Sequence, residues 1–284
     1  MKKVISASRR TDLVAFFSAW LSSVLQQKSA QVIGPSNHIY GVDLDPDHVH
    51  TLVLWSKNFS PLIENRKGLL VAVRKFAQIY LHFTITGNGG TLIEPGVPTW
   101  EYAVSQLDSL IKIAGCPERI SIRFDPVLFW TENQKSRTNL YFFEKLSREL
   151  YPRGLSRVHF SFAQWYRKAR IRAEKRGFNY YDPPVEEKMK YAGYLSEVAA
   201  RSQIQLYVCS QDVFAEVPGI KPSACIDGDL LQRLHPEKEP ASINKDKSQR
   251  KECHCTESID IGSYKLSCPH ACVYCYANPR LGGS

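Results

Sequence analysis

Three cysteines near the carboxyl terminus are spaced to hold a metal cluster. Cys268, Cys272 and Cys275 form a C-x3-C-x2-C run with an aromatic residue just before the last cysteine. Three thiolates on one short loop can bind three irons of a [4Fe–4S] cubane and leave the fourth iron without a protein ligand. An iron with a free position can bind and transform another molecule. The alternative is a structural zinc site with His270 or Cys255 as fourth ligand, although zinc knuckles usually use C-x2-C pairs.

A second candidate ligand set consists of Cys209, Cys225, Cys253 and Cys255. Four thiolates fully ligate either an iron–sulfur cluster or a zinc ion, so this set favours a closed centre beside the open one. Only Cys253 and Cys255 are close in sequence, and the alternative is buried, apolar free thiols. The eighth cysteine, Cys116, precedes a proline and has no nearby partner, which is typical of a packing residue.

The run CPHACVYCYAN, residues 268–278, resembles the motif of radical S-adenosylmethionine (SAM) enzymes. It is especially similar to the spore-photoproduct-lyase-like branch, which has an aromatic-Cys-Tyr ending. The resemblance implies that SAM binds the open iron, that cluster reduction cleaves it to a 5′-deoxyadenosyl radical, and that flavodoxin or ferredoxin is the reducing partner. In ordinary radical SAM enzymes the motif follows the first barrel strand. Here it lies nine residues from the end, which implies a rearranged version.

The whole chain also resembles an uncharacterised bacterial family. Its members open with Ser-Arg-Arg-Thr-Asp, here residues 8–12, and end in a cysteine-rich block. Three other segments are similar to that family: Cys-Ile-Asp (225–227), Gln-Arg-x-x-Cys-x-Cys (249–255) and Asp-Ile-Gly-x-Tyr (260–264). Two of them contain cysteines of the second set, so the resemblance supports a second metal centre.

Short apolar runs alternate with longer amphipathic stretches, which favours parallel strands joined by crossover helices. Six such units predict an α/β fold, a partial (β/α)6 TIM-like barrel over residues 1–209. A hairpin is expected within Gln31–Leu44, with its turn at 34–37. The expected strands are Lys3–Ala7, His50–Trp55, Gln78–Thr84, Arg119–Phe124, Arg157–Ser161 and Gln205–Cys209; the expected helices are Leu13–Gln27, Pro61–Phe76, Trp100–Ala114, Arg137–Leu150, Ala163–Arg176 and Pro184–Arg201.

Residues 210–284 differ in composition from the rest. They are rich in proline and polar residues, contain six of the eight cysteines, and show little apolar periodicity. Such a segment cannot build its own core, and bound metal can supply the missing folding energy. We therefore expect a cysteine-rich cap packed over the barrel mouth.

Polar residues follow each expected strand, at the end where parallel α/β folds bind ligands. Two arginines after the first strand can clamp an anion, while Thr11 or Asp12 there can cap a helix. The glycine segment after the third strand stands where radical SAM enzymes bind the SAM amino group, according to the resemblance, or forms a plain turn. The fourth strand carries an arginine and an aspartate that can bind a carboxylate and ribose hydroxyls, or form a structural ion pair. The candidate cofactor-binding residues are Arg9, Arg10, Lys57, Thr86, Gly87, Asn88, Arg123 and Asp125.

The chain has a net charge of +9, which favours polyanionic partners. A basic stretch between Arg153 and Arg176 is interleaved with aromatic residues, as in surfaces that bind nucleic acid, and a solvated basic helix is the alternative. A zinc-stapled nucleic-acid-binding protein, or a radical enzyme acting on DNA, therefore stands beside the radical SAM interpretation. The chain shows neither a run of ~20 apolar residues nor a signal peptide, so we expect a cytoplasmic protein that does not contact membranes.

Overall fold

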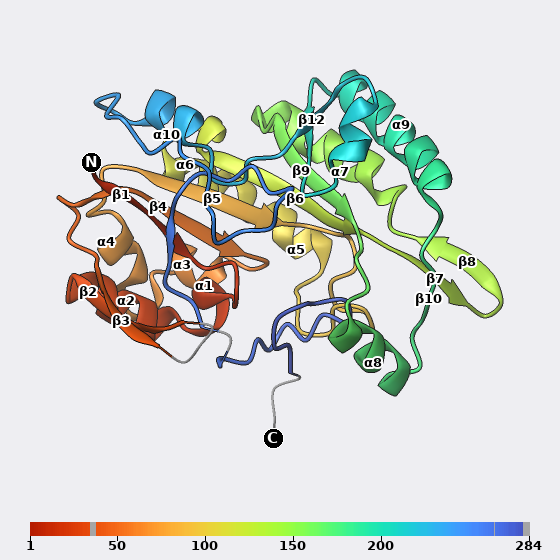
Figure 1. Cartoon of the computed structure of the whole chain (residues 1–284), viewed down its shortest axis with the longest axis horizontal. Coiled ribbons are helices and arrows are strands. Elements are labelled where there is room, and N and C mark those ends of the chain that lie inside the picture. Colours follow the sequence, from red (N-terminus) through yellow and green to blue (C-terminus); the bar gives the residue numbers. More distant parts are fainter. Residues whose placement is uncertain (35–37, 264, 281–284) are drawn as a thin grey trace.

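A computed structural model describes residues 1–34, 38–263 and 265–280. An eight-stranded sheet, in which every pairing is parallel, forms the centre of the molecule (Figure 1). The strand order is β12-β11-β9-β6-β5-β4-β1-β13. These strands are β1 Lys3–Ala7, β4 Val49–Ser56, β5 Ile79–Thr84, β6 Ile120–Val127, β9 Arg157–Phe162, β11 Gln205–Val208, β12 Ile220–Pro222 and β13 Ile259–Asp260.

The expected α/β class and all six expected strands are confirmed, with strand ends within three residues of those expected. The sheet contains two further strands, β12 and β13, which come from the segment expected to form only a cap. Strand β13 pairs with β1 through Ile259 opposite Ile5 and Asp260 opposite Ser6. Among the described residues, β12 and β13 are the two edges of the sheet and do not pair with each other.

Helices follow most of the central strands, and several have different bounds from those expected. The α-helices are α1 Leu13–Phe16, α2 Ser18–Gln26, α3 Ser60–Ile63, α4 Leu69–Val73, α5 Trp100–Ser105, α6 Leu107–Ala114, α7 Phe142–Leu150, α8 Arg167–Lys175, α9 Val185–Arg201 and α10 Gly228–Leu234, and the short 3-10 helices are η1 Arg66–Gly68, η2 Pro117–Arg119, η3 Tyr151–Arg153 and η4 Asp212–Glu216.

Three helices expected to be continuous are each divided in two. Phe17, with φ −123° and ψ 30°, separates α1 from α2. Asn65 and Lys67 take left-handed φ values of 52° and 55° between α3 and α4. At Gln106, α5 ends and α6 begins.

The helix expected to begin at Arg137 begins at Phe142, because residues 135–138 form a strand instead. That strand, β8 Lys135–Thr138, pairs antiparallel with β7 Phe129–Glu132, and β10 Asn179–Tyr180 completes a small sheet that projects from the molecule in Figure 1. The expected hairpin is confirmed as β2 Ser29–Ile33 and β3 Ile39–Asp43. Residues 35–37 of its expected turn lie outside the described residues.

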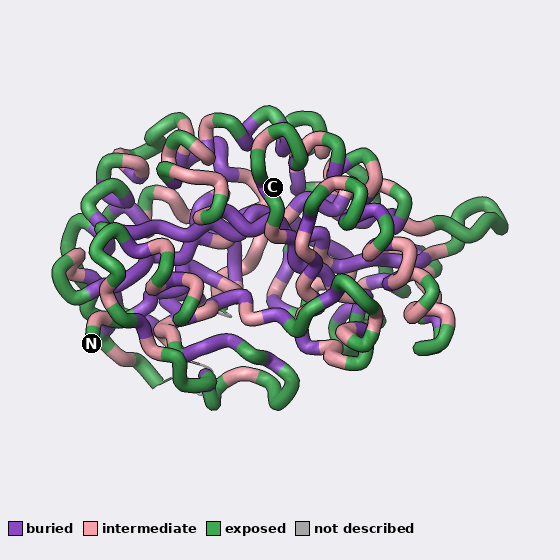
Figure 2. Tube along the Cα trace, turned by 90° about the horizontal axis from the view of Figure 1, so that it is seen from above, coloured by how far each residue is buried: buried purple, intermediate pink, exposed green. Residues whose placement is uncertain are grey.

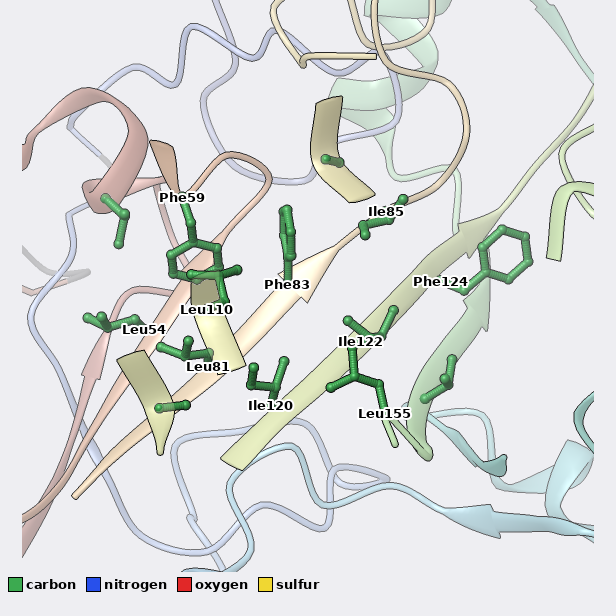
Figure 3. Close-up of a cluster of buried hydrophobic side chains, with 14 of the residues drawn as sticks. Leu54, Phe59, Leu81, Phe83, Ile85, Leu110, Ile120, Ile122, Phe124 and Leu155 are labelled. Atoms are coloured by element: carbon green, nitrogen blue, oxygen red, sulfur yellow. The ribbon is translucent and has the colours of Figure 1, made fainter. Parts of the chain in front are cut away.

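The two faces of the sheet are buried by different partners. Side chains that alternate along each strand point to opposite faces. On one face, Leu81 and Phe83 of β5 join the main core with residues of α2, α4, α6, α7 and α9. On the other face, Tyr80 packs with tail residues such as Ile226 and Cys255. Figure 2 shows the buried strands at the centre, and Figure 3 labels members of the main core: Leu54, Phe59, Leu81, Phe83, Ile85, Leu110, Ile120, Ile122, Phe124 and Leu155.

No helix within the described part of the chain combines the length and the apolar character that crossing a membrane requires.

Candidate metal centre and active site

A cavity of about 320 Å³ lies at the carboxyl ends of the central strands. Small-molecule sites commonly measure roughly 300–1,000 Å³. Residues at or just after the ends of β1, β4, β5, β6, β9 and β11 line the cavity, together with residues of the tail. Its lining includes Arg9, Arg10, Lys57, Arg123, Asp125, Cys209, Cys225, Cys253, Cys255, Cys268, Cys272 and Cys275. The structure therefore brings both cysteine sets and most of the expected strand-end residues to one place.

The cysteine loop, residues 268–275, is a series of tight turns. The Ala271 N–H donates to the Cys268 carbonyl at 3.2 Å, and the Cys275 N–H donates to the Cys272 carbonyl at 3.3 Å. Ala271 adopts a left-handed φ of 53°. For a residue other than glycine this conformation costs roughly 1–2 kcal/mol, so the surroundings must hold the loop in shape.

Helix α8 supplies part of that support through two arginines. Arg172 Nη1 donates to the carbonyl oxygens of Val273 and Cys275, both at 2.9 Å. Arg176 Nη1 donates to the carbonyl oxygen of Ala271 at 2.5 Å. Hydrogen bonds from a charged donor are stronger than neutral ones. The two guanidinium groups thus satisfy backbone carbonyls of the cysteine loop.

The basic stretch expected either to bind nucleic acid or to be a solvated helix is therefore partly structural. Besides the two arginines on the loop, Arg157 forms an ion pair with Asp227 at 3.4 Å. Trp165 stacks on Tyr180, with ring centroids 3.7 Å apart, so that one face of its ring is already covered. Nucleic-acid binding stays a prediction that depends on the exposed basic residues of α8, which are Arg167, Lys168, Arg170 and Lys175.

His270 connects the cysteine loop to the end of β1. Its Nε2 lies 2.7 Å from Oδ2 of Asp12, and its Nδ1 lies 2.9 Å from the carbonyl oxygen of Gly96. Asp12 also accepts hydrogen bonds from the Ser56 hydroxyl at 2.8 Å and the Lys57 N–H at 2.9 Å. Both ring nitrogens of His270 thus have acceptors within the protein. This histidine positions the loop and is not placed as a fourth metal ligand.

A buried ion pair lies beside the cysteine loop. Lys57 Nζ is 2.8 Å from Oε1 of Glu94, and the Tyr274 hydroxyl donates to the same oxygen. Glu94 is 1% exposed. Although burial opposes the charged form of each group, Lys57 lowers the pKa of Glu94, and Glu94 raises the pKa of Lys57. The pair is therefore ionised, and it fixes the aromatic residue that precedes the last cysteine.

The glycine segment Thr86–Asn88, expected to contact a cofactor, does not line the cavity. Thr86 hydrogen-bonds to Glu94 and thereby helps to lower the pKa of that carboxyl group. Gly87, with a φ of +80°, lies under the ring of Phe142, where an added Cβ would come within 2.6 Å of the ring. The segment supports the buried ion pair and packs against α7.

The environment of the cysteine loop keeps its thiols protonated in the absence of a cation. Burial raises the pKa of Cys268 to about 12, and the nearby Asp12 adds to the effect. Burial also raises the pKa of Cys272 well above its usual value, although the Lys57 charge opposes this. Metal ions bind thiolates, so metal binding at these residues releases protons.

The second cysteine set comes together on the sheet face covered by the tail. The sulfur atoms of Cys209 and Cys225 are 3.8 Å apart. Hydrogen bonds from Cys209 and Cys255 lower the pKa of Cys225 well below its usual value, and a hydrogen bond from Cys255 lowers the pKa of Cys253 to about 6. The four residues, dispersed in sequence, thus form one connected group in the structure.

The charged residues expected at the strand ends all line the cavity, and each has partners within the protein. Arg123 donates to Oδ2 of Asp125 and, through Nη1, to the sulfur of Cys225 at 2.9 Å. Arg9 Nη2 donates to Ser258 at 2.7 Å. Arg10 Nη1 donates to the Gly262 carbonyl at 3.1 Å. The ion pair between Arg123 and Asp125, given above as the alternative to cofactor binding, is therefore present, and Arg123 also links the strand ends to the second cysteine set.

Within the described residues, no group of three or more His, Cys, Asp and Glu side chains is arranged to hold one metal ion. A [4Fe–4S] cluster imposes a different requirement, because each thiolate binds a different iron and the ligand sulfurs do not meet at one point.

Comparison with known proteins identifies the family. A family model described as a domain of unknown function, DUF1848, matches residues 4–277. The chain belongs to the DUF1848 family. A search among curated proteins found no match. Because the DUF1848 match runs from β1 to the end of the cavity lining, the sheet and the cysteine-rich tail are both parts of the family domain.

The Asp-Ile-Gly segment of this DUF1848 chain connects β13 to the end of β1. Asp260 accepts hydrogen bonds from the Ser6 hydroxyl at 3.1 Å, the Ser8 hydroxyl at 2.9 Å and the Arg9 N–H at 2.9 Å. Gly262 has no room for a side chain, since its Cβ would lie 1.7 Å from the Ser8 hydroxyl. The segment therefore braces the first strand end, where the cavity begins. Tyr264 lies outside the described residues.

Sequence reasoning did not single out Glu94, Tyr274 or Arg172 as individual site residues. Glu94 follows a glycine-rich segment, and no recognisable sequence motif includes it. Tyr274 stands inside the C-x2-C spacing, so its position beside the last cysteine could have drawn attention to it. Arg172 was included only as one member of a basic stretch, because a charge run does not reveal which of its members face inward.

Proposed function

We propose that this DUF1848 protein is an iron–sulfur enzyme of the radical SAM type. The observation that carries the proposal is the position of the cysteine loop. Its three cysteines line a cavity at the carboxyl ends of parallel strands, where α/β enzymes bind their substrates. Their spacing suits a [4Fe–4S] cluster with one open iron. When bound and reduced, such a cluster supplies the electron that cleaves SAM, and an electron donor such as flavodoxin or ferredoxin is part of this proposal.

The chain's own residues have definable tasks in such a site. Arg172 and Arg176 hold the backbone of the cysteine loop from α8. The charge of Lys57 favours a thiolate at Cys272. Arg123 and Asp125 line the cavity, where a guanidinium group can bind a carboxylate and a carboxylate can accept hydrogen bonds from hydroxyl groups. These contacts suit a ligand that carries both kinds of group, as SAM does.

We further propose that the central sheet is a partial (β/α) barrel extended by strands of the tail. From β1 to β12, its strands follow one another in sequence order without reversal. Helices contribute to the core on one face, and the tail covers the other face. A doubly wound sheet would have a reversal in strand order and helices on both faces. The one-sided arrangement supports a barrel-like curvature.

Anaerobic reconstitution with iron and sulfide tests the proposed function. We expect about four irons or more per chain, with a broad brown absorption. Addition of SAM and dithionite should produce 5′-deoxyadenosine. The Cys272→Ala variant should lose this product, because one iron of the cluster loses its ligand.

The matched control is Cys116→Ala, since Cys116 is far from both cysteine sets in sequence and is not part of the cavity lining. This variant should bind iron and cleave SAM as the unaltered chain does. Equal cleavage by the Cys272→Ala variant would refute the proposed function, and so would reconstituted protein that binds no iron.

A further inference from the structure

The second cysteine set joins the irregular part of the tail to the central sheet. Cys209 follows directly after β11, whereas Cys225, Cys253 and Cys255 belong to the tail. Residues 235–258, all of which are described, contain no helix or named strand. The backbone hydrogen bonds of this segment, such as Asp246 N–H to the Cys255 carbonyl and Glu257 N–H to the Asn244 carbonyl, both 2.9 Å, belong to turns or an isolated β-bridge and not to a continuous helix or strand ladder. A cross-link through the four sulfurs would attach the segment to the sheet.

One pair of sulfur atoms in this set already has the spacing of two ligands on a single ion, although the four sulfurs are not gathered around one point in the described structure. Zinc–thiolate bonds are about 2.3 Å long, so two sulfurs on a tetrahedral zinc ion lie about 3.8 Å apart. The sulfurs of Cys209 and Cys225 are 3.8 Å apart. Cys255 hydrogen-bonds in turn to Cys225 and to Cys253. The four sulfurs thus form a connected chain, with Cys209 and Cys253 at its ends, and closure around an ion requires these two ends to turn toward the middle.

The surroundings of the four sulfurs resemble those of buried thiolate–metal sites. Cys225, Cys253 and Cys255 are buried in an apolar cluster with residues of β1, β4 and β5. Two N–H donors point at sulfur: Arg123 Nη1 at 2.9 Å from Cys225, and the Ile226 backbone at 3.4 Å from Cys255. Such donors partly neutralise the charge of metal-bound thiolates and orient them. An apolar shell with N–H donors suits a closed, structural site.

The charged residues around the second cysteine set also suit a zinc ion bound by four thiolates. A zinc ion with four thiolates has a net charge of about −2. Two largely buried arginines, Arg9 and Arg123, lie close enough to interact with these cysteines. Both arginines also interact with neighbouring aspartates, so only part of their positive charge is left to offset the negative charge of the site. Buried charge needs such compensation.

We propose that Cys209, Cys225, Cys253 and Cys255 together bind one zinc ion, which fastens the tail to the open face of the sheet. When the ion binds, those of the four cysteines that are still protonated release their protons to solvent. The site is structural, because all four positions of the ion are filled by protein. This inference does not depend on the proposed enzymatic function, since it involves a different set of ligands.

Metal analysis of two full-length variants tests the proposal. In the first, Cys268, Cys272 and Cys275 are replaced by serine, which leaves the second set intact. This variant, purified with zinc and dialysed, should retain about one zinc per chain. In the second, Cys253→Ser and Cys255→Ser are combined, and zinc should fall to the level of a buffer blank. Cys116→Ser is the control and should keep its zinc.

The outcomes separate this inference from the proposed function. Absence of zinc from the first variant would overturn the inference, whatever the iron content of the unaltered chain. Iron with sulfide in place of zinc in that variant would also overturn it, because it would indicate a cluster. A thermal melt supplies a second measurement on the first variant: removal of zinc by a chelator should lower the melting temperature, and re-addition should restore it. If the second variant fails to fold, the first variant still decides the result.

Discussion

Gly96 is the point at which the loop after β5 meets the backbone of the cysteine loop, and Gly96→Ala should damage both stability and metal binding. An added Cβ would lie 2.1 Å from the Pro269 carbonyl oxygen and 2.9 Å from the His270 Cα. Ordinary contacts begin at 3.4 Å, so the carbonyl would have to move by about 1.3 Å. Both obstructing groups are backbone, which cannot turn aside as a side chain can.

The cost of this substitution follows from the contacts that the shift would break. Gly96 donates its N–H to the His270 carbonyl at 3.1 Å and accepts at its own carbonyl from His270 Nδ1 at 2.9 Å. Displacement by about 1.3 Å takes both outside the range of about 2.7–3.2 Å. Loss of the two hydrogen bonds costs about 1–3 kcal/mol, and overpacking adds about 1–3 kcal/mol. We therefore expect the free energy of unfolding to fall by about 2–6 kcal/mol.

Urea denaturation of the purified chain measures this change, and iron content after reconstitution reports on the loop. The matched control is Gly193→Ala in α9, where an added Cβ has nothing within 4 Å. Alanine in a helix interior is better than glycine by roughly 0.5–1 kcal/mol, so this control should be neutral or slightly stabilised. A Gly96→Ala variant within about 0.5 kcal/mol of the unaltered chain, with full iron content, would refute close packing of Gly96 against the cysteine loop.

Two other substitutions probe the support of the cysteine loop. Lys57→Met leaves Glu94 buried without its cation, which should lower the free energy of unfolding by about 3–5 kcal/mol in urea denaturation; combination with Glu94→Gln should recover most of this loss, and no recovery would contradict the ion pair. Arg172→Gln removes a charged donor worth about 1.5–3 kcal/mol from two loop carbonyls, so a chelator should release iron from reconstituted protein about tenfold faster or more. Arg170→Gln, at an exposed position of the same helix, should not change this rate. Equal rates for the two variants would argue against a supporting role for the hydrogen bonds from Arg172 to the cysteine loop.

The strands could be predicted because their signal is local. The runs that became β4, β5 and β6 are short, apolar and rich in β-branched or aromatic residues, and each lies in the structure where its pattern placed it. The breaks in the helices were not predictable in this way. Asn65 and Lys67 take left-handed angles without being glycine, and no residue type in the segment demands them. Strand β8 was not predicted, because it is short and polar, and two of its residues were assigned to the helix that follows it.

The sequence predicted which strand-end residues line the candidate site, but it did not predict which loop residues hold them in place. Residues just after parallel strands converge on one edge of a sheet, which is why Arg9, Lys57 and Arg123 could be placed together beforehand. The same rule misplaced the segment after β5, where Thr86 faces Glu94 instead of the cavity. Loop conformation, which has no periodic signal, decided which residues of that segment turn inward.

The amino-acid pattern alone specifies the C-x3-C-x2-C spacing and the alternation of strand and helix, since both depend on residues that are close along the chain. The meeting of Cys209 with Cys225, and of Cys225 with the Cys253–Cys255 pair, depends on the folded chain. Sixteen residues separate the first two and thirty separate Cys225 from Cys255, so their spacing places no constraint on their contact. Burial of the tail against the sheet creates that contact, because the apolar face left open by the helices must be covered.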